Sequence, residues 1–359
     1  MHTESHAEKR KLTFAQAVNE GLYQAMEVDE SVICYGLGAT DPGGVFGTTK
    51  NLESAFGSER VFDMPTSENA MTGVAVGAAI GGLRPVMAHQ RLDFFLLAMD
   101  QLVNSAAKWH YMFGGQFTVP ITIRLIIGRG WGQGPTHSQS LHSWFTHIPG
   151  LKVVMPTTPA DAKGLLLASI ADPNPVLFLE HRWLHNIEDN VPIESYQVPL
   201  GTANLVREGS DLTIVSSGIL TVEAIQVTAL LNSVGIGVDL LDLRTLSPLD
   251  WTAIKSSVAK TGRILVLDAA SRSSSLAESI VSRISIEMSN ELRKAPLILA
   301  HPDGPEPTSY GLTRSFHVGG NDILWAAGEL CDVNVSELID KVFSREPHDV
   351  PGSWFQGPF

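Results

Sequence analysis

Hydrophobic positions in the first half of the chain alternate between helical spacing and short continuous runs. Apolar residues recur every three or four positions behind Thr13, which can cap a helix, and the apolar run 32–35 follows. Such runs are typical of strands that are buried on both faces. Further strands are predicted at 85–88, 121–127, 153–155 and 176–179, and further helices at 68–80, 94–107 and 160–170. The alternation indicates an α/β fold with a mostly parallel sheet.

The second half of the chain repeats this alternation after an interruption. Charged residues and prolines break the apolar period around 188–209, and we place a linker there. Strands are then predicted at 212–216, 238–243, 264–268 and 296–300, with helices at 221–233, 250–259 and 276–288. We therefore expect two α/β domains, which the length of 359 residues also favours. The expected bounds are 1–187 for the first domain, 188–209 for the linker, 210–345 for the second domain and 346–359 for a tail.

Charge and cysteine content narrow the classes of function. The chain carries 25 basic and 38 acidic residues, a net charge of −13, so its charge disfavours binding to nucleic acid. The two cysteines, Cys34 and Cys331, form neither a disulfide framework nor a metal-ligand motif. The polar start lacks the apolar core of a signal peptide, and no apolar run is long enough to cross a bilayer. We expect a soluble cytoplasmic protein with no membrane partner.

The segment 63–68 leads directly into a predicted helix and carries the first candidate for chemistry. Ser67 or Thr66 can cap this helix, and Glu68 then lies in its first turn. An isolated glutamate at such a place usually only complements the helix dipole. The glycines at 73, 77 and 81 form a smooth stripe on one face, and we expect close helix packing there, across a subunit interface.

Two further segments follow predicted strands. His89, Gln90 and Arg91 lie where a strand passes into a helix, a place that suits a ligand site as well as it suits a solvated turn. The glycine-rich loop 128–134 does not have the spacing of a phosphate-binding loop, so a flexible loop is expected. His137 follows this loop and has the placement of a general acid or base, although a lone histidine is more often structural.

Several motifs together resemble one family. They are Met-Pro-Thr-Ser-Glu at 64–68, Gly-Gly-Leu-Arg-Pro at 81–85, the run at 99–108, His-Ser-Gln-Ser at 137–140, and Pro-Gly-Leu-Lys-Val-Val at 149–154 with Asp-Ala-Lys-Gly-Leu at 161–165. The chain resembles the beta subunit of the decarboxylating component of 2-oxo acid dehydrogenase complexes, of the pyruvate and branched-chain type, within the transketolase superfamily. The likeness runs from about residue 12 to 314. It implies a thiamine-diphosphate-binding (pyrimidine) domain followed by a transketolase C-terminal-type domain.

The resemblance also implies roles for individual residues. Glu68 matches the glutamate that bonds the aminopyrimidine ring of thiamine diphosphate, Phe94 matches the residue that stacks on that ring, and Gln90 lines the same pocket. His137 matches a histidine near the reacting carbon. A potassium site, held partly through backbone oxygens, is implied at Ile121, Ser169, Asp172 and Asn174.

The partner follows from a missing motif. Family members hold the cofactor's diphosphate through Mg²⁺ with a Gly-Asp-Gly element, which this chain does not contain. The resemblance therefore implies an α₂β₂ heterotetramer in which an alpha-type subunit binds Mg²⁺ and the diphosphate. It also implies a beta-beta contact and a lipoyl acyltransferase core as a further candidate partner.

Two departures from the family keep other functions open. Gly36-Leu37-Gly38 lacks the usual acidic residue, and Ala88-His89-Gln90-Arg91 is more polar than the usual sequence. A polar pocket would suit a split transketolase-like enzyme that transfers a two-carbon unit between sugars or sugar acids. A non-catalytic scaffold is the third alternative. The second domain shows no catalytic constellation. Asp268 at a strand end and the run 271–275 could form a site, but a capped helix start is expected there instead.

Overall fold

The computed structural model describes residues 9–342 and 348–350. Its described residues form two compact units, of which the first takes those up to Ile126 and those from Ile148 to Leu200. The second unit takes Ile127–His147 and the described residues from Gly201 onward. Of the tail expected at 346–359, only 348–350 lies within the described residues. The domain bounds taken from the sequence stay predictions.

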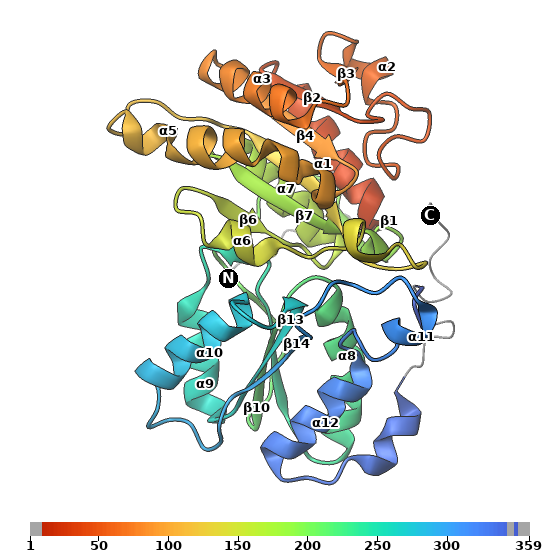
Figure 1. The fold of residues 1–359 in the computed structure, drawn as a ribbon, viewed down its shortest axis with the longest axis vertical. Helices are drawn as coiled ribbons and strands as arrows, with labels where there is room; N and C mark the ends of the chain where they lie inside the picture. Colours follow the sequence, from red (N-terminus) through yellow and green to blue (C-terminus); the bar gives the residue numbers. More distant parts are fainter. Residues whose placement is uncertain (1–8, 343–347, 351–359) are drawn as a thin grey trace, which may run out of the picture. The chain divides into compact units, whose positions relative to one another are not determined.

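Parallel strands build the sheet of the first unit, with helices packed around it (Figure 1). The strand order is β6-β7-β5-β4-β2-β3. The strands are β2 (Val32–Gly36), β3 (Val61–Asp63), β4 (Arg84–His89), β5 (Thr122–Ile127), β6 (Lys152–Val154) and β7 (Val176–His181). The main helices are α1 (Phe14–Val28), α2 (Leu52–Phe56), α3 (Glu68–Ile80) and α7 (Pro159–Ala171), with a 3₁₀ turn η4 (Arg182–Leu184). This confirms the mostly parallel α/β fold, and helices α1 and α7 lie against each other.

The segment predicted as one helix at 94–107 is a series of shorter turns. It consists of α4 (Leu92–Phe95), the 3₁₀ turn η1 (Leu96–Ala98), the π-helix η2 (Gln101–Ala106) and α5 (Ala107–Met112). The prediction of helical structure was right, but the uninterrupted α-helix was wrong. The apolar period cannot reveal a widened turn, because a π-turn changes the hydrogen bonds and leaves the residue types unchanged.

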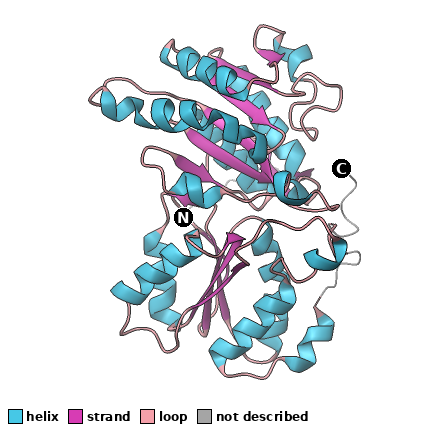
Figure 2. Cartoon of the chain, viewed as in Figure 1, coloured by secondary structure: helices cyan, strands magenta, loops and turns pink. Residues whose placement is uncertain are grey.

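The second unit is a smaller α/β unit (Figure 2). Its sheet has the order β14-β13-β10-β11-β9, parallel except for β9. The strands are β9 (Asn204–Arg207), β10 (Leu212–Ser216), β11 (Val238–Asp242), β13 (Ile264–Ser271) and β14 (Leu297–His301), and a short β12 spans Thr245–Ser247. The helices are η3 (Gly134–Thr136), α6 (His142–Thr146), α8 (Ile219–Ser233), α9 (Trp251–Thr261), α10 (Leu276–Glu287), α11 (Tyr310–Thr313), α12 (Gly320–Cys331) and η5 (Ser336–Lys341).

The segment expected as a linker contains two strands. Strand β8 (Glu188–Pro192) pairs antiparallel with β1 (Lys9–Thr13), and β9 forms the antiparallel edge of the second sheet. Both strands are short and largely polar, which is usual where one side of a strand has no neighbour. An apolar period could not identify them.

A buried ion pair joins β5 to β7 inside the first unit. Arg124 donates through Nε and a terminal nitrogen to the two carboxylate oxygens of Glu180, at 2.6 and 2.9 Å, and both side chains are fully buried. His185 lies 3.1 Å from the same carboxylate. Burial alone would raise the pKa of Glu180, but the Arg124 cation and the hydrogen bonds hold it below its usual value.

Among the described residues, no helix combines the length and the apolar character that crossing a membrane requires.

Candidate functional site

Glu68 is the first residue of α3, directly after β3, and is only 5% exposed. Ser67 occupies the N-cap position, but its side chain makes no capping hydrogen bond, so the predicted side-chain cap was wrong. Its backbone instead closes a tight turn, with Ser67 N donating to Pro65 O at 2.7 Å. The start of α3 therefore presents a buried carboxyl group beside N–H groups that no capping side chain occupies.

Gln90 follows β4 and reaches across to the end of the neighbouring strand β2. Its Nε2 donates to the carbonyl oxygen of Leu37 at 3.0 Å. A Cβ on Gly38 would lie 2.7 Å from that same nitrogen, and Gly38 has a φ of +75°. Gly38, one of the departures from the family pattern, therefore leaves the space that the Gln90 amide fills.

Phe94 lies in α4 and is 41% exposed. Helix α4 contacts α3, the helix that begins with Glu68. Glu68, Gln90 and Phe94 thus all follow the carboxyl ends of β3 and β4, where ligands bind in parallel sheets.

His89 does not point into open space. It is 1% exposed, and its ring lies 4.9 Å from that of Phe95, centroid to centroid. Neither ring nitrogen has a hydrogen-bond partner among the described residues. Burial lowers the pKa of His89 to about 4, so this imidazole is uncharged at neutral pH.

His137 belongs to the second unit and follows η3. Its Nδ1 lies 3.0 Å from Thr136 Oγ1. The glycine-rich loop before it is anchored, because Gly132 N donates to the Asp349 carboxylate at 3.0 Å and Arg129 pairs with the same carboxylate at 3.2 Å. The loop expected to be flexible is thus held by at least two polar contacts.

The residues implied as potassium ligands lie near the end of α7 and the strands beside it, and they are Ile121, Ser169, Asp172 and Asn174. Lysine and arginine side chains already donate hydrogen bonds to oxygens near the end of α7. Lys152 Nζ lies 2.5 Å from the Asp172 carboxylate, and Arg84 donates to the carbonyl oxygens of Ile170 and Asp172 at 2.8 and 3.3 Å. These contacts involve oxygens of Ile170 and Asp172 only, and the potassium site stays a prediction.

The second unit holds two groups of ionisable side chains that the sequence did not indicate. His142 Nε2 lies 2.7 Å from the buried carboxylate of Asp268. Burial would raise the pKa of Asp268, but His142 and two backbone N–H groups hold it below its usual value. The second group is His301, Glu306 and His317. No spacing signal could have found either group, whereas the expected cap was confirmed: Ser275 accepts from Glu278 N at the start of α10.

Comparisons with known proteins bear on both units. The model of the transketolase pyrimidine binding domain matches residues 10–186, and that of the transketolase C-terminal domain matches residues 201–323. The beta subunit of acetoin:2,6-dichlorophenolindophenol oxidoreductase from Cupriavidus necator is 42% identical, over 84% of this chain and 91% of that protein. The pyruvate dehydrogenase E1 component subunit beta from Acholeplasma laidlawii is 40% identical, over 84% and 92%.

One further relative and one solved structure are also similar to this chain. The 2-oxoisovalerate dehydrogenase subunit beta of Bacillus subtilis is 36% identical, over 89% of this chain and 99% of that protein. Among solved structures, a split gene transketolase described as an inactive beta4 tetramer superposes with a TM-score of 0.73 at 19% identity, covering 90% of this chain and 99% of that chain. At that identity the superposition shows the fold alone.

Proposed function

The chain belongs to the family of 2-oxo acid dehydrogenase beta subunits, built from transketolase-type pyrimidine-binding and C-terminal domains, and from this membership we propose its activity. With an alpha-type partner it decarboxylates a 2-oxo acid and passes the acyl group to a lipoyl acceptor. The observation that carries the proposal is the buried carboxyl group of Glu68 at the start of α3.

The residues of the first unit fit the aminopyrimidine end of thiamine diphosphate. When bound, this cofactor supplies a nucleophilic carbon and an electron sink for the 2-oxo acid. Glu68 would hold and exchange a proton at a ring nitrogen, since its buried carboxyl group lies at the start of α3 where the ring would bind. The partly exposed side chain of Phe94 would stack on the ring, and the Gln90 amide would line the pocket beside it. His137 would orient the substrate carboxylate or protonate the acceptor.

We further propose that an alpha-type subunit binds Mg²⁺ and the diphosphate, in an α₂β₂ assembly with a beta-beta contact. The absence of a Gly-Asp-Gly element supports this division. Large apolar side chains are exposed around α5, where a partner could cover them: Leu97, Tyr111, Met112, Phe113 and Phe117. An added Cβ on Gly77 of α3 would meet no atom within 4 Å, which leaves this part of the glycine face free for a neighbouring chain.

The buried position of His89 weakens the sugar-transferring alternative. That alternative rested on His89 and Arg91 as polar contacts in the pocket, and His89 packs against Phe95 instead. We therefore retain a 2-oxo acid as the substrate class. The free cysteines Cys34 and Cys331 fit a reducing compartment, and we place the enzyme in the cytoplasm.

Substitution of Glu68 tests the proposal in the reconstituted pair of subunits. Glu68→Gln keeps the shape of the side chain and removes the exchangeable proton, so turnover of 2-oxo acids should fall at least 100-fold or so. Glu53→Gln is the matched control, because Glu53 is also an acidic first-turn residue but is exposed in α2. Unchanged turnover in the Glu68→Gln enzyme would favour the scaffold alternative.

Calorimetry tests the division between subunits. Thiamine diphosphate with Mg²⁺ should bind weakly to this chain alone and tightly once the alpha-type chain is added. Tight binding to the isolated chain would contradict the split site.

A further inference from the structure

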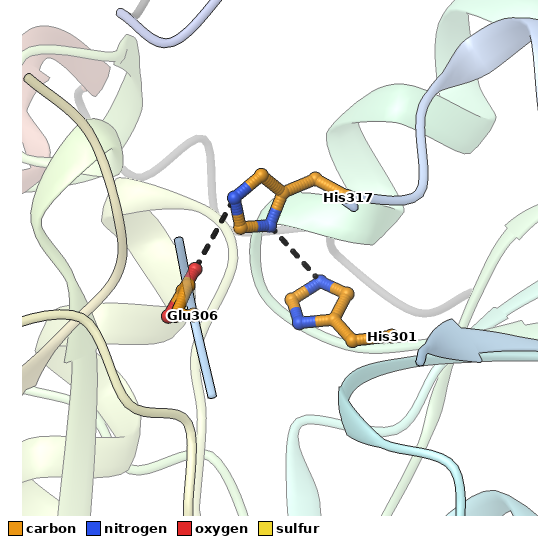
Figure 3. A group of neighbouring side chains, drawn as sticks. All are labelled: His301, Glu306 and His317. Carbon is orange, nitrogen blue, oxygen red and sulfur yellow. Dashed lines mark hydrogen bonds and ion pairs between the residues drawn. The ribbon is translucent and has the colours of Figure 1, made fainter. Parts of the chain in front are cut away.

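Three polar side chains meet beside a cavity of the second unit. His301 ends β14, Glu306 lies in the loop that follows, and His317 lies just before α12. Figure 3 shows the ring of His317 between the other two side chains, with one nitrogen turned toward His301 and the other toward Glu306. The end of β14 and the loops that follow it therefore converge on one point, at the carboxyl end of a parallel strand.

The three side chains lie close enough together to share one metal ion. His317 Nδ1 lies 3.4 Å from His301 Nε2, and the other nitrogen of the same ring, Nε2, lies 3.3 Å from Glu306 Oε1. A ligating imidazole offers one nitrogen to an ion, so only one of these two distances can be an edge of the site. One nitrogen from each histidine and one Glu306 oxygen lie within 4.8 Å of one another. In a tetrahedral Zn²⁺ site with bonds of about 2.0–2.1 Å, ligand atoms are about 3.3–3.4 Å apart, so the longest edge must shorten by at most about 1.5 Å.

The donor set selects a class of ion. Two imidazole nitrogens and one carboxylate oxygen suit divalent first-row transition ions, whereas Mg²⁺ and Ca²⁺ prefer oxygen ligands alone. The side chains of His317 and Glu306 are only 3% and 9% exposed, so water competes weakly for them. We propose that His301, Glu306 and His317 form a binding site for a divalent transition-metal ion of the Zn²⁺ type.

The site would be open on one side. His301 and Glu306 line a cavity of about 430 Å³, together with Ser271, Ser273 and Phe316. Three protein ligands leave a fourth position of a tetrahedral ion unfilled, and the cavity beside His301 and Glu306 offers space for a ligand there. The ion could therefore take water or a small oxygen-donor ligand from this side.

The surrounding charges are compatible with a bound cation. Burial lowers the pKa of His301 to about 4, and its imidazole is uncharged with a lone pair available at neutral pH. Arg129 is the nearby cation, and it is paired with Asp349 at 3.2 Å. Asp268, which also acts on His301, contributes a negative charge, and His142, 2.7 Å from Asp268, opposes its effect.

A titration of the full chain with Zn²⁺ tests the site without any measurement of turnover. Its outcome is therefore independent of the proposed function. The chain is prepared without a polyhistidine tag, stripped with a chelator and titrated by calorimetry, and then with Co²⁺ under visible absorption. One equivalent should bind, and Co²⁺ should give the intense visible bands of a four-coordinate ion. Wild-type protein that binds no Zn²⁺ would overturn the proposal and leave the cluster as a hydrogen-bonded chain.

Three variants locate the bound ion, because the chain has twelve histidines. Glu306→Gln preserves shape and should weaken Zn²⁺ binding at least about tenfold, while His301→Gln and His317→Gln should abolish the Co²⁺ bands. His147→Gln, at an exposed histidine of the same unit, is the control and should bind as wild type does. If circular dichroism shows that a histidine variant does not fold, the Zn²⁺ affinity of Glu306→Gln tests the site instead. An affinity of Glu306→Gln equal to that of wild type would refute the site.

Discussion

The buried, uncharged His89 should make the stability of the protein sensitive to mild acid. Burial holds its pKa at about 4, against 6.5 for a solvated histidine. A tenfold change in proton affinity is worth about 1.4 kcal/mol, so the full difference corresponds to about 3 kcal/mol. His89 is 1% exposed, so solvent screening does not reduce this value appreciably.

The sign follows from which state binds more protons. Above pH 6.5 the imidazole is uncharged in the folded and the unfolded chain, and the contribution to stability is complete. Between pH 6.5 and about 4 the unfolded chain binds a proton that the folded chain excludes, so acid lowers the free energy of unfolding. At pH 5.0 the loss due to His89 should be about 2 kcal/mol.

Urea unfolding followed by circular dichroism, at pH 7.5 and pH 5.0, measures this loss. His89→Leu should lose about 2 kcal/mol less than wild type between the two pH values. At pH 7.5 the variant should be about as stable as wild type, because it removes two nitrogens without hydrogen-bond partners but also the ring contact with Phe95. The effect of His89 is taken as the difference between wild type and variant. His301 also has a pKa of about 4, so it contributes to the acid loss in both proteins.

His110→Gln, at an exposed histidine of the same unit, is the control and should follow wild type. If His89→Leu and wild type lose the same stability on acidification, His89 is not held uncharged by burial, and the argument fails.

Three other substitutions test interactions that stabilise the first unit. Arg124→Met leaves the Glu180 carboxylate buried without its ion pair and should lower the free energy of unfolding by about 3–5 kcal/mol in urea; a loss below 1 kcal/mol or so would contradict this. Gly150→Ala should cost at least about 2 kcal/mol, measured as a lower Tm, because φ is +96° and the new Cβ would lie 1.9 Å from Ala107 O. Thr13→Ala removes a side-chain cap of α1 and should cost about 1 kcal/mol in the same assay, whereas Thr13→Ser should restore most of it.

Local patterns were sufficient where a structure depends on neighbouring residues alone. The helix predicted at 68–80 and the strand predicted at 212–216 have the predicted bounds, and Thr13 caps α1 in a capping box with Gln16. These features follow from apolar spacing and from side-chain oxygens that reach N–H groups of the next turn. The placement of Glu68 at the start of a helix was predictable for the same reason.

Other features depend on contacts between distant parts of the chain. Strands β8 and β9 form only because β1 and β11 offer hydrogen-bonding edges to two polar segments. The burial of His89 could not be predicted, because a polar residue at a strand end is usually solvated, and here it packs on Phe95.

The sequence by itself determined the two α/β alternations and the segment that carries Glu68, since both arise from short-range periodicity and from recognisable motifs. Only the tertiary structure decided which ionisable groups meet. His142 and Asp268 are 126 positions apart in the chain, and His301, Glu306 and His317 come from a strand end and the loops that follow. His142 and Asp268 become neighbours only when α6 packs beside β13, and the loops after β14 must fold back before Glu306 and His317 reach His301.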